Sequence, residues 1–315
     1  MTTAALVALP LYATLTPALT SSVGGVGLLV GVAAAAAVLA GAAQPWLGHR
    51  AGLLGRPHRA GAAAVTGLLT LLSCLAVGQL RPALLATALT AAVTYPLFTV
   101  DLKQKRLPIA LVRPVTGWVL VTLSLDALLI DGGGRRMATA LAGAVAGAVV
   151  FHGLRVISRG GMGRGDVRLA SLLGLLLGWL SPATALLGLA LSFVLAAAAL
   201  VPFLLTHRLQ RHTKVPFGPF MLVGAWTAVG LHAVAFLSAS GVSSSFSRAT
   251  GVIETLSAWA GPALLLTALA VAVWTTREVA QRAGGLGPVV YPQPMTATAP
   301  GVVVREDGWP WRSSR

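Results

Sequence analysis

Charged residues are scarce in this chain of 315 residues, where Asp, Glu, Lys and Arg together make up only 10%. An ordinary soluble domain contains about a quarter. Hydrophobic residues make up 56% of the chain, and its mean hydropathy is +0.82. A water-soluble protein of this composition would expose large apolar patches and aggregate. The shortage of charge therefore excludes a water-soluble globular protein and indicates a membrane protein.

Cysteine is almost absent, because Cys74 is the only one and lies within an apolar run. A single cysteine excludes an internal disulfide and a cysteine-rich zinc site. His207 and His212 lie in a basic loop without a nearby carboxylate, which is a poor arrangement of metal ligands. We expect no metal site.

Acidic residues are few, since 8 Asp and Glu stand against 23 Lys and Arg, for a formal net charge of +15. Nucleic-acid-binding proteins are basic and polar, whereas this chain is basic and apolar. The positive charge therefore indicates an anionic lipid bilayer as the partner, and no nucleic acid.

Long apolar runs are what the chain does contain. A membrane-crossing helix needs about 20 mostly apolar residues, and nine segments are candidates. They are Val23–Ala43, Gly61–Gln79, Pro82–Val100, Pro114–Ile130, Met137–Leu154, Asp166–Leu180, Ala183–Leu205, Phe217–Leu237 and Ala258–Thr276. Residues 4–19 are apolar but interrupted by Pro10 and Pro17, so they form a tenth span, an interfacial helix or neither. The sequence predicts an all-α fold, a polytopic transmembrane helical bundle of about nine spans.

The basic residues are distributed unevenly between the loops of this nine-span arrangement. One set of alternate loops contains 14 Lys and Arg, and the other set contains 4. Because cytoplasmic loops are enriched in Lys and Arg, the first set is predicted to face the cytoplasm, with the C-terminal tail on the same side. The tail, residues 277–315, is expected to be disordered. The predicted location is the cytoplasmic (inner) membrane.

Six of the eight carboxylates have ordinary explanations; Asp126, for example, is expected to be exposed at the interface near the end of its span. The other two, Asp101 and Asp166, lie where a helix meets the cytoplasmic interface, within basic loops. Ionisable groups at membrane depth are costly and suggest function. An alternative is that each carboxylate only caps a helix or pairs with a neighbouring cation, such as Lys103 or Arg168.

Two carboxylates at one membrane face allow a specific chemistry. Carboxylates that lie close together share one proton, because both cannot ionise cheaply side by side. The ionised one can take a proton from water, while the protonated one hydrogen-bonds a peptide carbonyl and later protonates the leaving amine. Gly163 and Gly165 would let the backbone turn sharply before Asp166 and let a substrate strand approach closely. We therefore consider Asp101 and Asp166 a candidate catalytic pair.

Three blocks around these residues resemble the type IV prepilin peptidases, a bacterial family of GxGD-type aspartyl proteases in membranes. Gly161–Trp179 resembles the family's G-x-G-D segment with its downstream Gly and Gly-Trp. Asp101, followed by Leu107-Pro108, resembles the Asp-x5-Ile/Leu-Pro segment. Val215–Phe220 resembles the Pro-Phe-Gly-Pro-Phe motif that opens a late helix.

This resemblance implies that residues 82–238 form a six-helix catalytic core with Asp101 and Asp166 as the catalytic residues. It implies an aspartic endopeptidase that removes short basic leaders from prepilin or pseudopilin precursors at the cytoplasmic face, after a glycine and before a hydrophobic helix. No metal or organic cofactor is implied. Residues 44–59 lack the cysteines that accompany N-methyltransferase activity in many members, so we do not expect that activity. The residues expected to bind substrate or shape the site are Gly163, Gly165, Pro108, Arg168, Pro216, Gly218 and Pro219.

The rest of the chain has a less specific interpretation. Residues 1–81 are expected to be N-terminal spans with a basic cytoplasmic loop, and residues 239–276 an extracytoplasmic loop and the last span. His232, within its predicted span, is expected to be a hydrogen-bonded structural residue. An alternative function is a proton- or cation-coupled transporter that uses the same two aspartates, but transporters tend to place such groups near the bilayer midplane and to contain internal repeats. A purely structural membrane subunit would require the three blocks to match by chance.

Overall fold

The computed structural model describes residues 23–50, 59–77, 81–105, 107–158, 162–205, 216–239 and 250–284. Within these ranges the regular structure is all helix, without a strand. The helices are α2 (Val23–Arg50), α3 (Arg59–Val77), α4 (Pro82–Gln104), α5 (Ile109–Leu129), α6 (Gly133–Ile157), α7 (Arg164–Leu180), α8 (Pro182–Leu205), α9 (Gly218–Ala239) and α11 (Thr250–Gly284). Each of the nine predicted segments corresponds to one of them, and the predicted all-α helical bundle is confirmed. The predictions for residues 4–19 and 285–315 lie outside the described residues.

The chain is a multi-pass membrane protein. Among the described helices, seven are long and apolar enough to cross a membrane, namely α3, α4, α5, α6, α8, α9 and α11. The described apolar part of α2, Gly31–Ala43, is shorter. Helix α7 has 17 residues and is therefore about 26 Å long, less than the roughly 30 Å thickness of the hydrocarbon core. Of the nine predicted spans, α7 therefore falls short of full membrane-crossing length by this measure.

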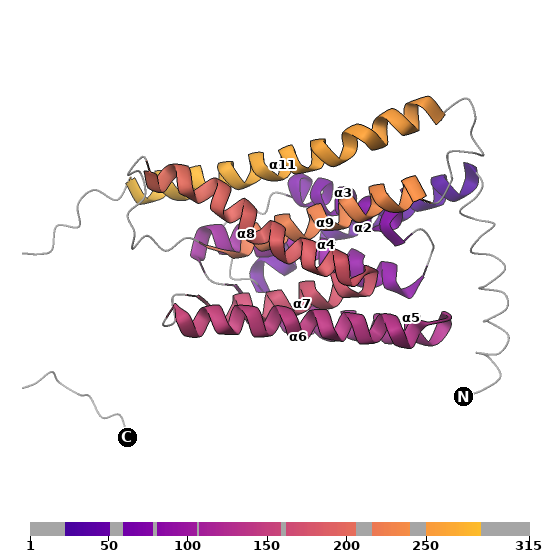
Figure 1. The fold of residues 1–315 in the computed structure, drawn as a ribbon, viewed down its shortest axis with the longest axis horizontal. Helices are drawn as coiled ribbons and strands as arrows, with labels where there is room; N and C mark the ends of the chain where they lie inside the picture. The colour runs from indigo at the N-terminus through magenta and orange to yellow at the C-terminus, as the bar shows by residue number, and fades with distance from the viewer. Residues whose placement is uncertain are drawn as a thin grey trace, which may run out of the picture.

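The short helix α7 lies inside the bundle. The helices run side by side along the long axis of the molecule, with α6 at one side and α11 at the opposite side (Figure 1). Most of the side chains of α7 are buried, from Leu169 to Trp179. A lipid-facing helix needs no such burial, so α7 is an inner helix, packed against α5, α6, α8 and α9.

Glycines bring α6 and α7 into close contact. A Cβ atom on Gly143 would collide with the backbone carbonyl of Gly174, and one on Gly147 would lie 2.6 Å from the carbonyl oxygen of Ala170. Small residues at four-residue spacing let helix backbones approach closely in a membrane. The contact fixes the position of α7 against α6 in the bundle.

Several helices, α4 and α11 among them, extend beyond the apolar runs that predicted them. Helix α4 continues past Val100 to Gln104, which places Asp101 within its last turn. Helix α11 continues to Gly284, so residues 277–284 are helical and do not begin a disordered tail. Apolar runs mark only the part of a helix that lies in hydrocarbon, whereas its ends depend on capping geometry.

Candidate active site

A cavity of about 660 Å³ lies at the end of the bundle where α4 and α6 end and where α7 and α9 begin. Asp101 from α4 and Asp166 from α7 both line it. Their carboxylates are close enough for the two negative charges to interact. The remaining walls come from the segment between α4 and α5, the ends of α5 and α6, the interior of α8, and the residues that precede α9. The two aspartates that the sequence singles out therefore share one cavity.

Asp101 is held at the end of α4 by backbone geometry and by a contact with α9. The C-cap residue of α4, Lys105, has φ 53° and ψ 35°, the left-handed conformation in which many helices end. Its N–H donates to the carbonyl oxygen of Asp101 at 2.8 Å. The Asp101 residue is only 3% exposed, and its Oδ2 accepts a hydrogen bond from the backbone N–H of Gly218 at 3.0 Å. This bond ties the end of α4 to the start of α9.

A second hydrogen bond holds α4 against α9 at a distance from the cavity. Trp226 Nε1 donates to Thr94 Oγ1 at 3.0 Å, and both residues are buried. Thr94 precedes Asp101 by about two turns of α4, and Trp226 follows Gly218 by a similar distance on α9. The two contacts together define how α4 and α9 are aligned, and so where the Asp101 carboxylate lies.

Asp166 is the third residue of α7, and Gly163 is the N-cap residue of that helix. Asp166 Oδ2 accepts a hydrogen bond from the Gly163 N–H at 3.0 Å. A carboxylate at this position satisfies an otherwise unpaired amide and interacts favourably with the helix dipole. The alternative that Asp166 caps its helix is therefore correct, but the capping carboxylate also lines the cavity. The two roles are compatible because a carboxylate has two oxygens with several acceptor sites.

The sequence also allowed Asp101 and Asp166 to pair with a neighbouring cation. No such ion pair forms within the described residues. The ion pair found there joins Arg81 and Asp126, and neither Lys103 nor Arg168 pairs with the two aspartates of the cavity.

Leu107 packs against two glycines beside the cavity. A Cβ atom on Gly165 would lie 2.6 Å from Leu107 Cβ. A Cβ atom on Gly218 would lie 2.5 Å from Asp101 Oδ2 and 3.4 Å from Leu107 Cδ1. A side chain at either glycine would force its neighbours to move. The sequence predicts that a substrate strand approaches Gly165 closely. In the structure, the chain's own segment between α4 and α5 makes this close approach.

The remaining predicted site residues divide into two groups. Gly163 and Pro216 line the cavity. Pro108, Arg168 and Pro219 are not among its lining residues. Pro108 is the extended N-cap residue of α5, and Pro219 is the second residue of α9, where a missing N–H breaks no intrahelical bond. Arg168 lies two residues from the carboxylate of α7, and residues at this spacing do not share a helix face.

Sequence reasoning missed the basic and aromatic residues of the cavity. Lys105 and Arg164 line it, as do Phe193 from α8 and Phe217, the residue before α9. The two basic residues could have been found from their position beside the aspartates in the chain. Phe193 has no comparable local indication, because α8 reaches the cavity only through tertiary packing.

Two polar side chains inside the predicted spans lie away from the cavity. The expectation for Asp126 is wrong, because its side chain is 0% exposed and its Oδ2 lies 4.0 Å from Nε of Arg81, whose side chain is 10% exposed. The cation comes from the residue before α4, so the end of a neighbouring helix covers the carboxylate. His232 is hydrogen-bonded as expected, with its Nδ1 3.0 Å from Thr184 Oγ1. Neither residue lines the cavity.

Comparison with known proteins identifies the part of the chain that holds both aspartates. Residues 88–201 match the type IV leader peptidase family. Over these residues the chain is similar to that family. The leader peptidase match contains Asp101 and Asp166 but ends before the start of α9, which supplies the Gly218 amide. Searches of curated proteins and of solved structures gave no match for the chain.

The family supports peptidase activity on leader-bearing, prepilin-like precursors in general. Within the described part of the chain, no cluster of His, Cys, Asp and Glu is arranged to hold a metal ion.

Proposed function

We propose that the protein is a membrane aspartic endopeptidase that removes the short basic leader from type IV prepilin-like or pseudopilin precursors at the cytoplasmic face. One observation carries this proposal: two carboxylates from separate helices, both within the stretch that matches the leader peptidase family, line a single cavity. A pair of this kind is the minimum that aspartic peptide hydrolysis requires.

The chemistry divides between the two carboxylates. One is ionised and removes a proton from a water molecule, whose oxygen attacks the peptide carbonyl carbon. The other is protonated and donates its hydrogen bond to the carbonyl oxygen, which stabilises the charge that develops there. A proton then passes to the leaving nitrogen, the C–N bond breaks, and the products are a leader carboxylate and a new amino terminus. The backbone amides of Gly163 and Gly218 each bind one of the carboxylates and hold it in place.

The position of the carboxylates favours this function over the transporter alternative. Asp101 lies in the last turn of α4, and Asp166 lies in the first turn of α7. Both are therefore at one end of the bundle, where a polar leader can enter from water. A coupled transporter tends to hold such groups near the bilayer midplane on broken helices.

The test is co-expression of the full-length protein with a pilin-like precursor, with loss of the leader followed on a gel. Asp101→Asn and Asp166→Asn should each lower the cleavage rate by about 10²–10⁴-fold, the usual contribution of general acid–base catalysis. Membrane insertion of each variant is checked by the amount of protein in the membrane fraction.

The matched control is Asp131→Asn, since Asp131 is exposed and follows α5 at the end of the bundle remote from the cavity. It should cleave at the wild-type rate. Asp126 does not serve as a control, because its buried carboxylate faces Arg81. Full processing by either asparagine variant of the cavity would overturn the mechanism.

A further inference from the structure

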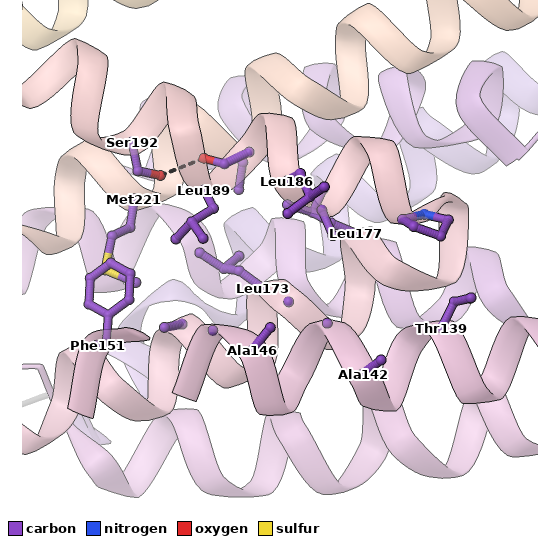
Figure 2. Close-up of a pocket in the computed structure, with 18 residues that line it drawn as sticks. Thr139, Ala142, Ala146, Phe151, Leu173, Leu177, Leu186, Leu189, Ser192 and Met221 are labelled. Atoms are coloured by element: carbon purple, nitrogen blue, oxygen red, sulfur yellow. Dashed lines mark hydrogen bonds between the residues drawn. The ribbon is translucent and has the colours of Figure 1, made fainter. Parts of the chain in front are cut away.

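An apolar groove runs along the bundle between α6, α7 and α8 (Figure 2). Ala142 and Ala146 of α6 form one side, Leu173 and Leu177 of α7 form the floor, and Leu186 lies on the opposite side on α8. Its cavity volume is about 240 Å³. Nothing in the proposed peptide hydrolysis uses these residues.

The groove continues from the catalytic cavity along the same helices. On α7, Asp166 lines the cavity and Ala170 lines the groove, one helical turn apart. On α9 and the residue before it, Phe217 lines the cavity and Met221 the groove. Helices α6 and α8 likewise contribute to both. A chain bound at the aspartates therefore meets the groove about one helical turn, roughly 5 Å, farther along.

Three phenylalanine rings mark the boundary between the two spaces. The Phe151 ring centroid lies 5.6 Å from that of Phe193 and 5.6 Å from that of Phe217. Phe193 and Phe217 line the cavity, and Phe151 lines the groove. The surroundings thus change from carboxylates and basic side chains to aliphatic side chains across this cluster.

The groove is accessible from the side of the bundle. Ala142 and Ala146 are exposed, and Leu186 is 67% exposed. Along α6 the lining extends from Thr139 to Phe151, a length of about 18 Å. A helix already embedded in the bilayer can therefore reach the groove by lateral movement, without leaving the hydrocarbon.

We propose that this groove binds one face of the precursor's hydrophobic helix, the segment that follows the scissile bond. The proposal rests on the proposed function, because it needs a substrate in which a polar leader directly precedes an apolar helix. With the scissile bond at the aspartates, that helix begins where the lining becomes apolar.

The size and lining of the groove favour a helix face. A helix 18 Å long with its side chains fills about 1,400 Å³, so the groove receives only the side chains that project from one face. Alanines and glycines line the α6 side, and small residues let a second helix approach closely in lipid. Binding away from the scissile bond then helps to orient the peptide at the carboxylates.

The experiment compares two substrates in proteoliposomes that contain the full-length protein. The first is a pilin-like precursor with its complete hydrophobic helix, and the second is a soluble peptide with the same leader and cleavage site followed by polar residues. Ala146→Trp should fill the groove and lower the cleavage of the precursor by about tenfold or more, because lost remote binding reduces turnover. Cleavage of the soluble peptide should change by less than about twofold.

The matched control is Ala138→Trp, an equal substitution at an exposed residue of α6 that does not line the groove. It should leave the cleavage of both substrates unchanged. Equal loss on both substrates with Ala146→Trp, or no loss on the precursor, would overturn the proposal. A wild-type protein that cleaves neither substrate would overturn the proposed function itself.

A second measurement does not depend on turnover. Photoreactive p-benzoylphenylalanine replaces Ala146 in the Asp166→Asn background, where the precursor is not cleaved, and in parallel replaces Ala138. Position 146 should crosslink to the hydrophobic helix of the precursor, and position 138 should not. Crosslinks from position 146 to lipid alone would show that an acyl chain occupies the groove and would contradict the proposal.

Discussion

Gly218, the first residue of α9, holds the carboxylate of Asp101 at the end of α4. Its N–H binds Asp101 Oδ2, and a Cβ atom in its place would lie 2.5 Å from that oxygen. Gly218→Ala should therefore push the carboxylate aside and lower the cleavage rate by about 10–100-fold, since a displacement of about 1 Å at a reacting group costs up to 100-fold. The measurement is the cleavage rate of a pilin-like precursor in proteoliposomes.

Gly153→Ala provides the comparison for this substitution. A Cβ atom on Gly153 would meet nothing within 4 Å, so the variant should retain the wild-type rate. If Gly218→Ala cleaves as fast as Gly153→Ala, the contact between Gly218 and Asp101 does not position the carboxylate.

Individual residues also show what the sequence could and could not predict. Asp101 and Asp166 could be singled out because few carboxylates compete with them and both lie in recognisable motifs. The bond from Gly218 to Asp101 joins residues 117 positions apart, and the buried Asp126 lies beside Arg81, the residue before α4. Such long-range contacts leave no periodic pattern in the sequence, so only the folded chain reveals them.

At the scale of helices, the contact between α6 and α7 sets the position of the candidate site. A side chain on Gly143 would collide with the backbone of Gly174, which cannot move independently of α7. Gly143→Leu should force the two helices apart and lower the free energy of unfolding by about 2 kcal/mol or more. It should also slow cleavage, because α7 carries Asp166. Thermal unfolding of the purified protein in detergent measures the first effect, and precursor cleavage measures the second.

The same substitution on the same helix tests whether the loss is specific. Gly153→Leu also introduces a large side chain into α6, at a position where a Cβ atom has open space. It should leave both the melting temperature and the cleavage rate near their wild-type values. Equal destabilisation by the two variants would mean that any leucine in α6 is harmful and that the α6–α7 contact has no special role.

Helices are also the scale at which the sequence was most informative. Apolar runs predicted each described helix, the short α7 included, because a backbone in hydrocarbon must satisfy its hydrogen bonds internally. Helix ends were less predictable. The apolar run ends at Val100, whereas α4 ends at Lys105, its C-cap residue in the left-handed conformation. Composition does not predict this conformation at a lysine.

At the scale of the whole molecule, the distribution of basic residues predicts which side of the membrane the cavity faces. Ser158, at the cavity end, and Asp131, at the opposite end, are both exposed, and Cys74 is buried. In a Cys74→Ser background, a membrane-impermeant maleimide added to right-side-out vesicles should label Asp131→Cys and leave Ser158→Cys unlabelled. The reason is that loops rich in Lys and Arg remain on the cytoplasmic side.

Inside-out vesicles should give the reverse pattern. Labelling of Ser158→Cys from the outer side would place the cavity outside the cytoplasm and would contradict cleavage at the cytoplasmic face. Labelling of each cysteine in both kinds of vesicle would indicate a mixed insertion, contrary to the single orientation that the asymmetry of 14 against 4 basic residues predicts.

The phenylalanine cluster at the inner end of the cavity has a consequence for the cell that contains this protein. A hydrolase needs liquid water beside its carboxylates, yet continuous water across a bilayer would conduct protons. The rings of Phe151, Phe193 and Phe217 pack together with centroids 5.4–5.6 Å apart, and the groove beyond them is lined mainly by apolar side chains. We expect these rings to limit the passage of water and ions from the cavity into the groove, which would preserve the membrane potential during the proposed hydrolysis.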